Sequence, residues 1–328
     1  MNKFIAVLGL MIIALITGCQ QELVVEEQER LSIGIMLSDV GLGDQSFSDA
    51  AFQGLIQARD ELGIIFDYRE LEQMGSYEQG LQELIDGEHD LIIGLGFMVK
   101  DDLEAKAEQN PDQQFVLIDD RSELPNVISV TFKEHEGSFL AGIAAGLATD
   151  SGVVGFVGGA DVPLINKFKA GFEQGVKSVD SSYQVLVEYA NDFGSVGVGQ
   201  EIARDMIDNE ADVLYAAAGL TGVGVLTEAQ AQEIYAIGVD SDQYFIAEKA
   251  VITSMMKYID EAVYQVVIDF VSGDLLNQSN IELGLQEAGV GLAPFRLVNE
   301  ESYQKEVSKW SEDIVSGSQK VEEDGGRN

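Results

Sequence analysis

Short apolar runs alternate with amphipathic stretches along the chain from residue 31 onward. Each apolar run has the length of a buried strand, and the segments between them repeat their apolar residues at helical spacing, most clearly in residues 47–62 and 77–85. The predicted strands cover residues 31–37, 64–69, 90–94, 114–118, 153–157, 183–188, 213–216 and 234–238. This alternation predicts an α/β fold with parallel sheets that carry helices on both faces.

The pattern contains two successive series of strands and helices. A long helix is predicted over residues 134–148, and the second series begins at Val153. A further strand at 252–257 and a helix at 259–271 indicate later crossings of the chain between lobes, so we expect two doubly wound lobes. The predicted N-terminal lobe comprises residues 31–133 and 256–290, the C-terminal lobe residues 134–255 and 291–316, and a disordered tail residues 317–328.

The N-terminus has the features of an export signal. Lys3 precedes an apolar run over residues 4–16, which is shorter than the roughly 20 residues of a membrane-spanning helix. The sequence Ile-Thr-Gly-Cys that ends at Cys19 resembles the bacterial lipobox, which implies removal of residues 1–18 and a diacylglycerol on the cysteine thiol. Residues 19–30 are then an acidic tether, and the protein is expected at the outer face of the cell membrane, held by its lipid. The alternative is an incidental thiol in an uncleaved signal.

Charge and cysteine content exclude several classes of function. The chain has 328 residues and a formal net charge of −38, so it would repel the phosphate backbone of a nucleic acid. Its single cysteine rules out an internal disulfide, a cysteine-rich zinc site and a redox pair. We therefore expect no nucleic-acid partner.

Common catalytic and cofactor motifs are missing from the sequence. It contains no strand-GxGxxG-helix unit, GxxxxGK[ST], HExxH or GxSxG. His89 and His135 are isolated from any nucleophile in the sequence, and both are expected to be ordinary surface residues. We expect no catalytic residue and no cofactor.

Acidic residues follow several of the predicted strands. Asp39 comes after the first strand, Asp119 after the fourth and Asp240 after the eighth. Ligands of open parallel sheets bind at the carboxyl ends of the strands, so these carboxylates are candidate ligand acceptors. The spacing of Asp39, Asp44 and Asp49 also suggests calcium or magnesium, but it lacks the EF-hand pattern, and we expect no metal site.

Seven segments, in order along the chain, resemble one protein family. They are DVGLGDQSFSDAAFQGL, FKEHEGSFLAGIAAG, GFVGGADVPLINKFKAGFEQGV, AAAGLTGVGV, AIGVDSDQ, ITSMMKYIDEAVY and GVGLAPF. The family is that of the basic membrane proteins, nucleoside-binding lipoproteins of ABC importers similar to the purine nucleoside receptor. The resemblance implies a type I periplasmic-binding-protein fold, in which two lobes are joined by a hinge. It also implies a purine nucleoside ligand, an ABC permease and ATPase as partners, and no enzymatic activity.

The same resemblance implies roles for individual residues. Asp39 and Phe47 fall in the family's nucleoside site, with Phe47 stacked on one face of the base and Phe193 on the other. Stacking of this kind contributes roughly 1–3 kcal/mol per base. The alternative for both phenylalanines is ordinary core packing.

Four further positions match polar or backbone contacts of the family. Asp119 and Asp240 correspond to acceptors for sugar hydroxyls and base nitrogens, although an aspartate after a strand is also a common helix N-cap. Lys257 corresponds to a lysine in the cleft that donates to a ligand oxygen. Gly219 stands where the backbone can approach the ligand closely.

The sequence departs from the family pattern in three places. Ser48 replaces the usual asparagine after the stacking phenylalanine, Leu220 replaces a usual glycine, and Ala51-Phe52 stands where a tryptophan is common. Ser48 keeps a hydroxyl but loses an amide that can both donate and accept. These departures bear on base selectivity rather than on the fold.

The leading hypothesis is a monomeric, lipid-anchored solute-binding protein that captures purine nucleosides by lobe closure. A surface sensor of the same fold without a transport role is the second, motivated by Ser48. The third is an extracellular nucleoside-cleaving enzyme that uses Asp39, Asp119 or Asp240. The sequence shows no recognisable acid-base pair for such an enzyme. A DNA-binding repressor of this fold is excluded by the charge and the export signal.

Overall fold

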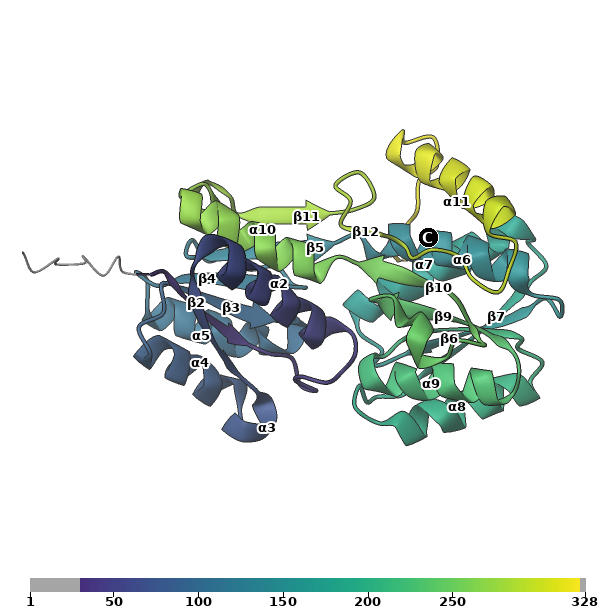
Figure 1. Cartoon of the computed structure of the whole chain (residues 1–328), viewed down its shortest axis with the longest axis horizontal. Coiled ribbons are helices and arrows are strands. Elements are labelled where there is room, and N and C mark those ends of the chain that lie inside the picture. Colours follow the sequence, from purple (N-terminus) through teal and green to yellow (C-terminus); the bar gives the residue numbers. More distant parts are fainter. Residues whose placement is uncertain (1–29, 325–328) are drawn as a thin grey trace, which may run out of the picture. The chain divides into compact units, whose positions relative to one another are not determined.

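The computed structural model describes residues 30–324, and the chain from Leu31 onward forms one compact unit. Two six-stranded sheets organise this part of the chain (Figure 1). In spatial order, the first sheet consists of β11 (Asn280–Leu283), β5 (Val127–Phe132), β4 (Gln114–Ile118), β3 (Leu91–Leu95), β1 (Ser32–Met36) and β2 (Ile65–Arg69). The second consists of β12 (Val290–Leu292), β10 (Val251–Lys257), β9 (Tyr235–Asp240), β8 (Val213–Ala217), β6 (Val153–Gly158) and β7 (Gln184–Tyr189). Neighbouring strands run parallel in both sheets, apart from the antiparallel pair of β10 and β12.

Helices cover both faces of the first sheet. The helices α2 (Phe47–Leu62) and α10 (Ile259–Ser272) pack together on one face, and α4 (Tyr77–Asp86) and α5 (Lys100–Gln109) lie on the other. Along β1, Ile33 and Ile35 are buried toward α2, whereas Met36 is buried among residues of α4 and α5. Since both faces are apolar, the strands read as continuous apolar runs in the sequence.

The second sheet is covered in the same way. The helices α6 (Glu134–Ala148) and α7 (Pro163–Val179) lie on one face, and α8 (Val196–Asp208) and α9 (Gly219–Ala231) on the other. Two glycines allow α6 and α7 to pack closely. A Cβ atom at Gly142 would lie 2.3 Å from the carbonyl oxygen of Phe172, and one at Gly175 would lie 2.1 Å from that of Phe139. A larger residue at either position would push the two helices apart.

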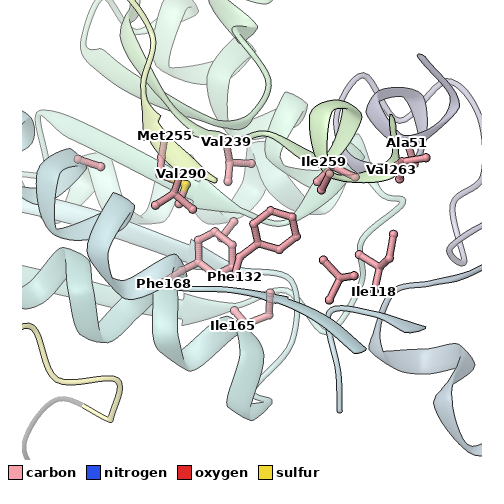
Figure 2. Close-up of a cluster of buried hydrophobic side chains, with 14 of the residues drawn as sticks. Ala51, Ile118, Phe132, Ile165, Phe168, Val239, Met255, Ile259, Val263 and Val290 are labelled. Atoms are coloured by element: carbon pink, nitrogen blue, oxygen red, sulfur yellow. The ribbon is translucent and has the colours of Figure 1, made fainter. Parts of the chain in front are cut away.

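One apolar cluster extends from the first sheet to the second (Figure 2). The members labelled in Figure 2 come from or directly beside strands of both sheets and from the helices that cover them: Ile118, Phe132, Val239, Met255, Val290, Ile165, Phe168, Ile259, Val263 and Ala51. The chain passes from the first sheet to the second after β5, returns after β10, and passes again after β11. These crossings bring residues that are far apart in sequence to the same place.

The remaining elements are short, apart from α11 (Glu300–Val315). They are α3 (Leu71–Met74) and the 3-10 helices η1 (Phe97–Val99), η2 (Gln243–Ile246) and η3 (Leu275–Asn277). Every strand predicted from the sequence is present within a residue or two, and the predicted α/β class is confirmed. Three strands were not predicted: β5, β11 and β12. Polar Ser129 and Thr131 interrupt β5, and β11 and β12 are too short to give a periodic signal.

The predicted disordered tail differs from the structure over residues 317–324. There the chain folds back onto α7, where the side-chain amide of Gln174 donates to the carbonyl oxygen of Glu322 (2.7 Å) and accepts from its amide (3.0 Å). Lys167 pairs with Glu323 at 3.3 Å, and Val321 is 7% exposed. One apolar residue and a paired amide therefore fix a segment whose composition alone favours disorder.

The predicted signal peptide, Cys19 and nearly all of the predicted tether lie outside the described residues. Within residues 30–324, none of the helices combines the length and the apolar character needed to cross a membrane.

Candidate ligand-binding site

A cavity lies where the carboxyl ends of strands from both sheets meet. From the first sheet it is lined by residues after β1, β3 and β4. From the second it is lined by residues after β7 and β8, by the ends of β9 and β10, and by α7. Seven of the eight ligand-site residues predicted from the sequence line it: Asp39, Phe47, Asp119, Phe193, Gly219, Asp240 and Lys257. The fold thus gathers side chains that are more than 200 residues apart in sequence into one cavity.

Ser48 is the predicted site residue that does not line the cavity. Its side chain is fully buried, and its hydroxyl lies 2.7 Å from that of Ser38, which does line the cavity. The backbone amide of Ser48 donates to Asp44 (2.7 Å). Ser48 thus contacts two residues of the cavity wall, Ser38 and Asp44, without lining the cavity itself.

Asp44 and Asp49 hold the loop before α2. Asp44 accepts from the backbone amides of Ser46 and Ser48, and Asp49 accepts from those of Gly43 and Gln45. Over residues 30–324, the structure has no group of three or more histidine, cysteine, aspartate or glutamate side chains that could hold a metal ion. The two carboxylates shape the loop that carries Phe47.

The two strand-end aspartates share an unusual backbone conformation. Asp119 has φ of 74° and Asp240 has φ of 63°, in the left-handed region that non-glycine residues seldom adopt. Such conformations concentrate at functional sites, because the surrounding structure must stabilise them. In both residues this conformation turns the chain sharply at the end of the strand and leaves the carboxylate in the cavity wall.

Lys257 lies in a buried ion cluster that joins the two sheets. Its Nζ is 2.6 Å from Oδ1 of Asp119, at the end of β4, and 3.1 Å from Oε1 of Glu134, at the start of α6. Lys257 is 2% exposed and Glu134 is fully buried. Three aromatic rings surround the ammonium, with centroids 4.8–5.7 Å away: Phe132, Phe47 and Phe168. The cation is thus held by both charge and aromatic faces.

Burial and charge change the pKa values in this cluster. Burial opposes the charge on Lys257, but the carboxylates of Asp119, Glu134 and Asp240 outweigh it and raise the pKa of Lys257 above its usual range. Burial raises the pKa of Glu134 to about 7, against the lowering effect of Lys257. Burial also raises the pKa of Asp240 to about 6. Neither carboxylate oxygen of Glu134 has a hydrogen-bond partner within residues 30–324.

Direct hydrogen bonds connect the tips of the two sheets across the cavity. The hydroxyl of Ser46, before α2, donates to Oδ2 of Asp240, the last residue of β9 (2.6 Å). The side chains of Ser241 and Gln243 both donate to the backbone carbonyl of Gln45, at 3.2 and 3.3 Å. We call these three bonds the cross-cavity latch.

Aromatic residues form the apolar part of the wall. Phe47 and Phe193 are half-buried, and Phe97, which follows β3, lies with its ring centroid 6.4 Å from that of Phe193. A Cβ atom at Gly159 would lie 2.1 Å from the ring of Phe193, so glycine is required there to accommodate the ring. The cavity therefore combines flat apolar surfaces with carboxylate acceptors.

Sequence reasoning missed Phe97, Glu134, Ser46 and Tyr77. The position of Phe97 after a strand was a usable signal, because ligands bind at strand ends. Nothing in the sequence separates Glu134, fully buried, from Glu136 two residues later. Tyr77 is the first residue of a helix and does not directly follow a strand in the sequence.

The two histidines lie away from the cavity. The Nδ1 atom of His89 is 2.6 Å from the hydroxyl of Ser32, and His135 is 6% exposed beneath the C-terminal segment. Burial lowers the pKa of both imidazoles. Contrary to the prediction that they are surface residues, both are buried, and neither contributes to the cavity.

Known proteins resemble this chain over nearly all of its described length. The family model "Bmp: ABC transporter substrate-binding protein PnrA-like" matches residues 32–324. The CD4+ T-cell-stimulating antigen of Listeria monocytogenes is 35% identical, over 88% of this chain and 87% of its own. The ABC transporter nucleoside-binding protein BmpA of Lactococcus lactis is 30% identical, over 88% of each chain.

Among solved structures, an ABC transporter solute-binding protein from Aeropyrum pernix superimposes with a TM-score of 0.80 at 26% identity, over 88% of this chain and 92% of that one. The expected type I periplasmic-binding-protein fold is confirmed. The protein binds a solute and is not an enzyme, as expected from the sequence. The chain belongs to the Bmp family of ABC transporter substrate-binding proteins.

Proposed function

We propose that this protein captures purine nucleosides and delivers them to an ABC permease and its ATPase. The observation that carries the proposal is the composition of the cavity, where two half-buried phenylalanines accompany two strand-end carboxylates and one buried lysine. A purine nucleoside matches this set, because its base offers flat faces and its ribose offers hydroxyl donors. The name of the Lactococcus relative, a nucleoside-binding protein, supports the same ligand class.

In this proposal Phe47 and Phe193 stack on the base, and the carboxylates accept from ligand hydroxyl and N–H groups. Hydrogen bonds to a charged acceptor are worth about 1.5–3 kcal/mol each. Lys257 directs part of its ammonium to Asp119 and Glu134, which leaves limited donor capacity for a ligand oxygen. Gly219, with φ of 54°, adopts a conformation in which the backbone can approach the base. Asp39 is a further acceptor in the wall.

Binding proceeds by closure of the two lobes around the stacked base. The cross-cavity latch supports this mechanism, because its bonds link the Asp44–Ser46 loop to the segment after β9 and would open if the lobes separated. The ligand leaves unaltered, since the site is used for binding alone.

The proposal also includes attachment of the protein to the membrane by a lipid. Lipidation at Cys19 would hold the monomeric protein on the outer face of the membrane, close to the permease. Residues 20–30 would act as a tether between the lipid and the folded part.

Mass spectrometry of the molecules released on denaturation tests the function. The full chain is purified in detergent, denatured and extracted, and the same preparation is screened for thermal shifts with purine and pyrimidine nucleosides. We expect a co-purified purine nucleoside or a rise in melting temperature with purine nucleosides. A thermal shift with free sugars, and none with any nucleoside, would overturn the ligand assignment.

A further inference from the structure

Tyr77 lines the cavity from α4, an element that supplies none of the site residues predicted from the sequence. Tyr77 is the first residue of α4, whose N-cap Ser76 accepts from the amide of Gln79. Its side chain packs against the apolar cluster between α4, α5 and the first sheet, which includes Leu81 and Leu103. Packing on this cluster fixes the ring, and the residue forms part of the cavity wall beside Asp39.

This hydroxyl is buried and has no hydrogen-bond partner within residues 30–324. A buried polar group without a partner costs folding free energy, so its presence calls for a physical reason. Tyr215 offers the contrast, because its buried hydroxyl lies 3.0 Å from that of Ser138. The fold thus provides a hydrogen-bond partner for the buried hydroxyl of Tyr215, but none within residues 30–324 for that of Tyr77.

The other buried side-chain atoms without hydrogen bonds have different surroundings. Those of Asp119 and Glu134 lie in the ion cluster with Lys257, and that of His135 lies beneath the C-terminal segment, away from the cavity. Among these atoms of the described chain, the Tyr77 hydroxyl alone belongs to a cavity-lining residue that has no ion-pair partner.

The environment makes this hydroxyl a donor. Burial, with the charges of Asp39 and Asp102, raises the pKa of Tyr77 and keeps the phenol protonated. Most polar side chains of the cavity are carboxylates, which only accept hydrogen bonds when ionised. A ligand that satisfied them all with its donors would still need an acceptor for the phenol. A purine nucleoside carries such acceptors in its ring nitrogens and ribose oxygens.

We propose that Tyr77 is a ligand-binding residue whose hydroxyl donates a hydrogen bond to an acceptor atom of the bound nucleoside, and so selects for ligands that carry this acceptor. The inference rests on the proposed function and adds to it a specificity-determining contact. A site built to pair a ligand group discriminates strongly against analogues that lack it, because the protein group is then left unpaired.

The test compares Tyr77→Phe with Tyr215→Phe in the full chain, using inosine, adenosine and guanosine as ligands. Calorimetry gives the affinity, and thermal unfolding without ligand gives the stability. For Y77F we expect an unchanged or higher melting temperature and at least tenfold weaker nucleoside binding. For Y215F we expect a lower melting temperature and an affinity within twofold of wild type, because Tyr215 loses a partner and does not line the cavity.

A set of nucleoside analogues identifies the acceptor. Deaza analogues that lack one ring nitrogen each, and deoxy analogues that lack one ribose oxygen each, are titrated into the wild type and Y77F. The analogue that lacks the acceptor should bind both proteins equally. If Y77F does not fold, the wild type alone decides, since equal affinities across the whole set would overturn the inference.

The outcomes separate the inference from the proposed function. Wild-type binding of nucleosides together with Y77F affinities within twofold would overturn the role of Tyr77 and leave the function standing. A lower melting temperature for ligand-free Y77F would show that the hydroxyl has a structural partner, which also contradicts the inference. Absence of nucleoside binding by the wild type would overturn the proposed function, and the inference with it.

Discussion

Asp119 and Asp240 lie at equivalent places at the tips of the two sheets, but their carboxylates have different bonding partners. Asp119 directly follows β4 and Asp240 is the last residue of β9; both have left-handed backbone and both line the cavity. The carboxylate of Asp119 is paired with Lys257 at 2.6 Å, whereas Asp240 receives a bond from the neutral hydroxyl of Ser46. The first tip therefore serves as an electrostatic link between the sheets, and the second keeps its acceptor capacity for a ligand.

Removal of Lys257 should have the largest effect, because it would leave Asp119 and Glu134 buried without a counter-charge. We expect Lys257→Met to lower the free energy of unfolding by about 3–5 kcal/mol, measured by urea denaturation. The matched control is Lys100→Met, whose partner Asp120 lies 3.1 Å away at a partly exposed site, where a pair is worth about 0–1 kcal/mol. Equal losses in the two variants would contradict the structural role of the ion cluster.

Substitution at the second tip should act on binding rather than on stability. Asp240→Asn keeps the shape of the side chain but removes a charged acceptor, so we expect nucleoside affinity to fall by about 1.5–3 kcal/mol. Calorimetry measures the change. Asp120→Asn is the control. Asp120 does not line this cavity, so the nucleoside affinity of the variant should match that of the wild type. A larger loss of affinity in the control would refute the assignment of Asp240 as a ligand acceptor.

The ion cluster should also make stability depend on pH. Because the pKa of folded Glu134 is about 7 and its ordinary value is 4.5, the folded state holds this proton more tightly than the unfolded state. The stabilisation is complete below about pH 4.5 and is lost as the pH rises through 7. Glu134→Gln removes this titration, so the free energy of unfolding of the variant relative to wild type should rise by about 2–3 kcal/mol between pH 5 and pH 8.

Denaturation at several pH values measures that difference. Glu136→Gln is the control, because Glu136 is not fully buried and its own pairing with Lys133 is long, at 3.7 Å. A stability difference between E134Q and wild type that stays constant from pH 5 to pH 8 would show that Glu134 does not titrate in this range.

Loss of one latch bond should have the smallest effect. Ser46→Ala removes the hydroxyl that donates to Asp240, and a single hydrogen bond contributes about 0.5–1.5 kcal/mol. We expect the nucleoside to dissociate several-fold faster, as seen by stopped-flow fluorescence, with little change in association rate. Ser178→Ala, which removes an exposed bond within α7, should leave the dissociation rate unchanged. A slower dissociation in S46A would contradict the latch.

Much of the fold could be predicted from the sequence, because buried parallel strands leave long apolar runs. The cavity residues at strand ends, such as Asp39 and Asp240, could be located by the same logic. Tyr77 could not, because it enters the cavity from the start of a helix and its importance depends on the lack of a nearby partner. Ser48 shows the opposite error. It was predicted to contact the ligand because it follows Phe47 in the motif, but its side chain contacts Ser38 and does not line the cavity.

Equilibrium titration shows whether the two sheet tips together hold one purine nucleoside. Inosine and guanosine are titrated by calorimetry into the full chain, with cytidine and ribose as comparisons. We predict saturable binding of one purine nucleoside per chain, with ribose bound far more weakly because it offers no aromatic ring to Phe47 and Phe193. Equal binding of ribose and inosine, or no binding of any nucleoside, would contradict it.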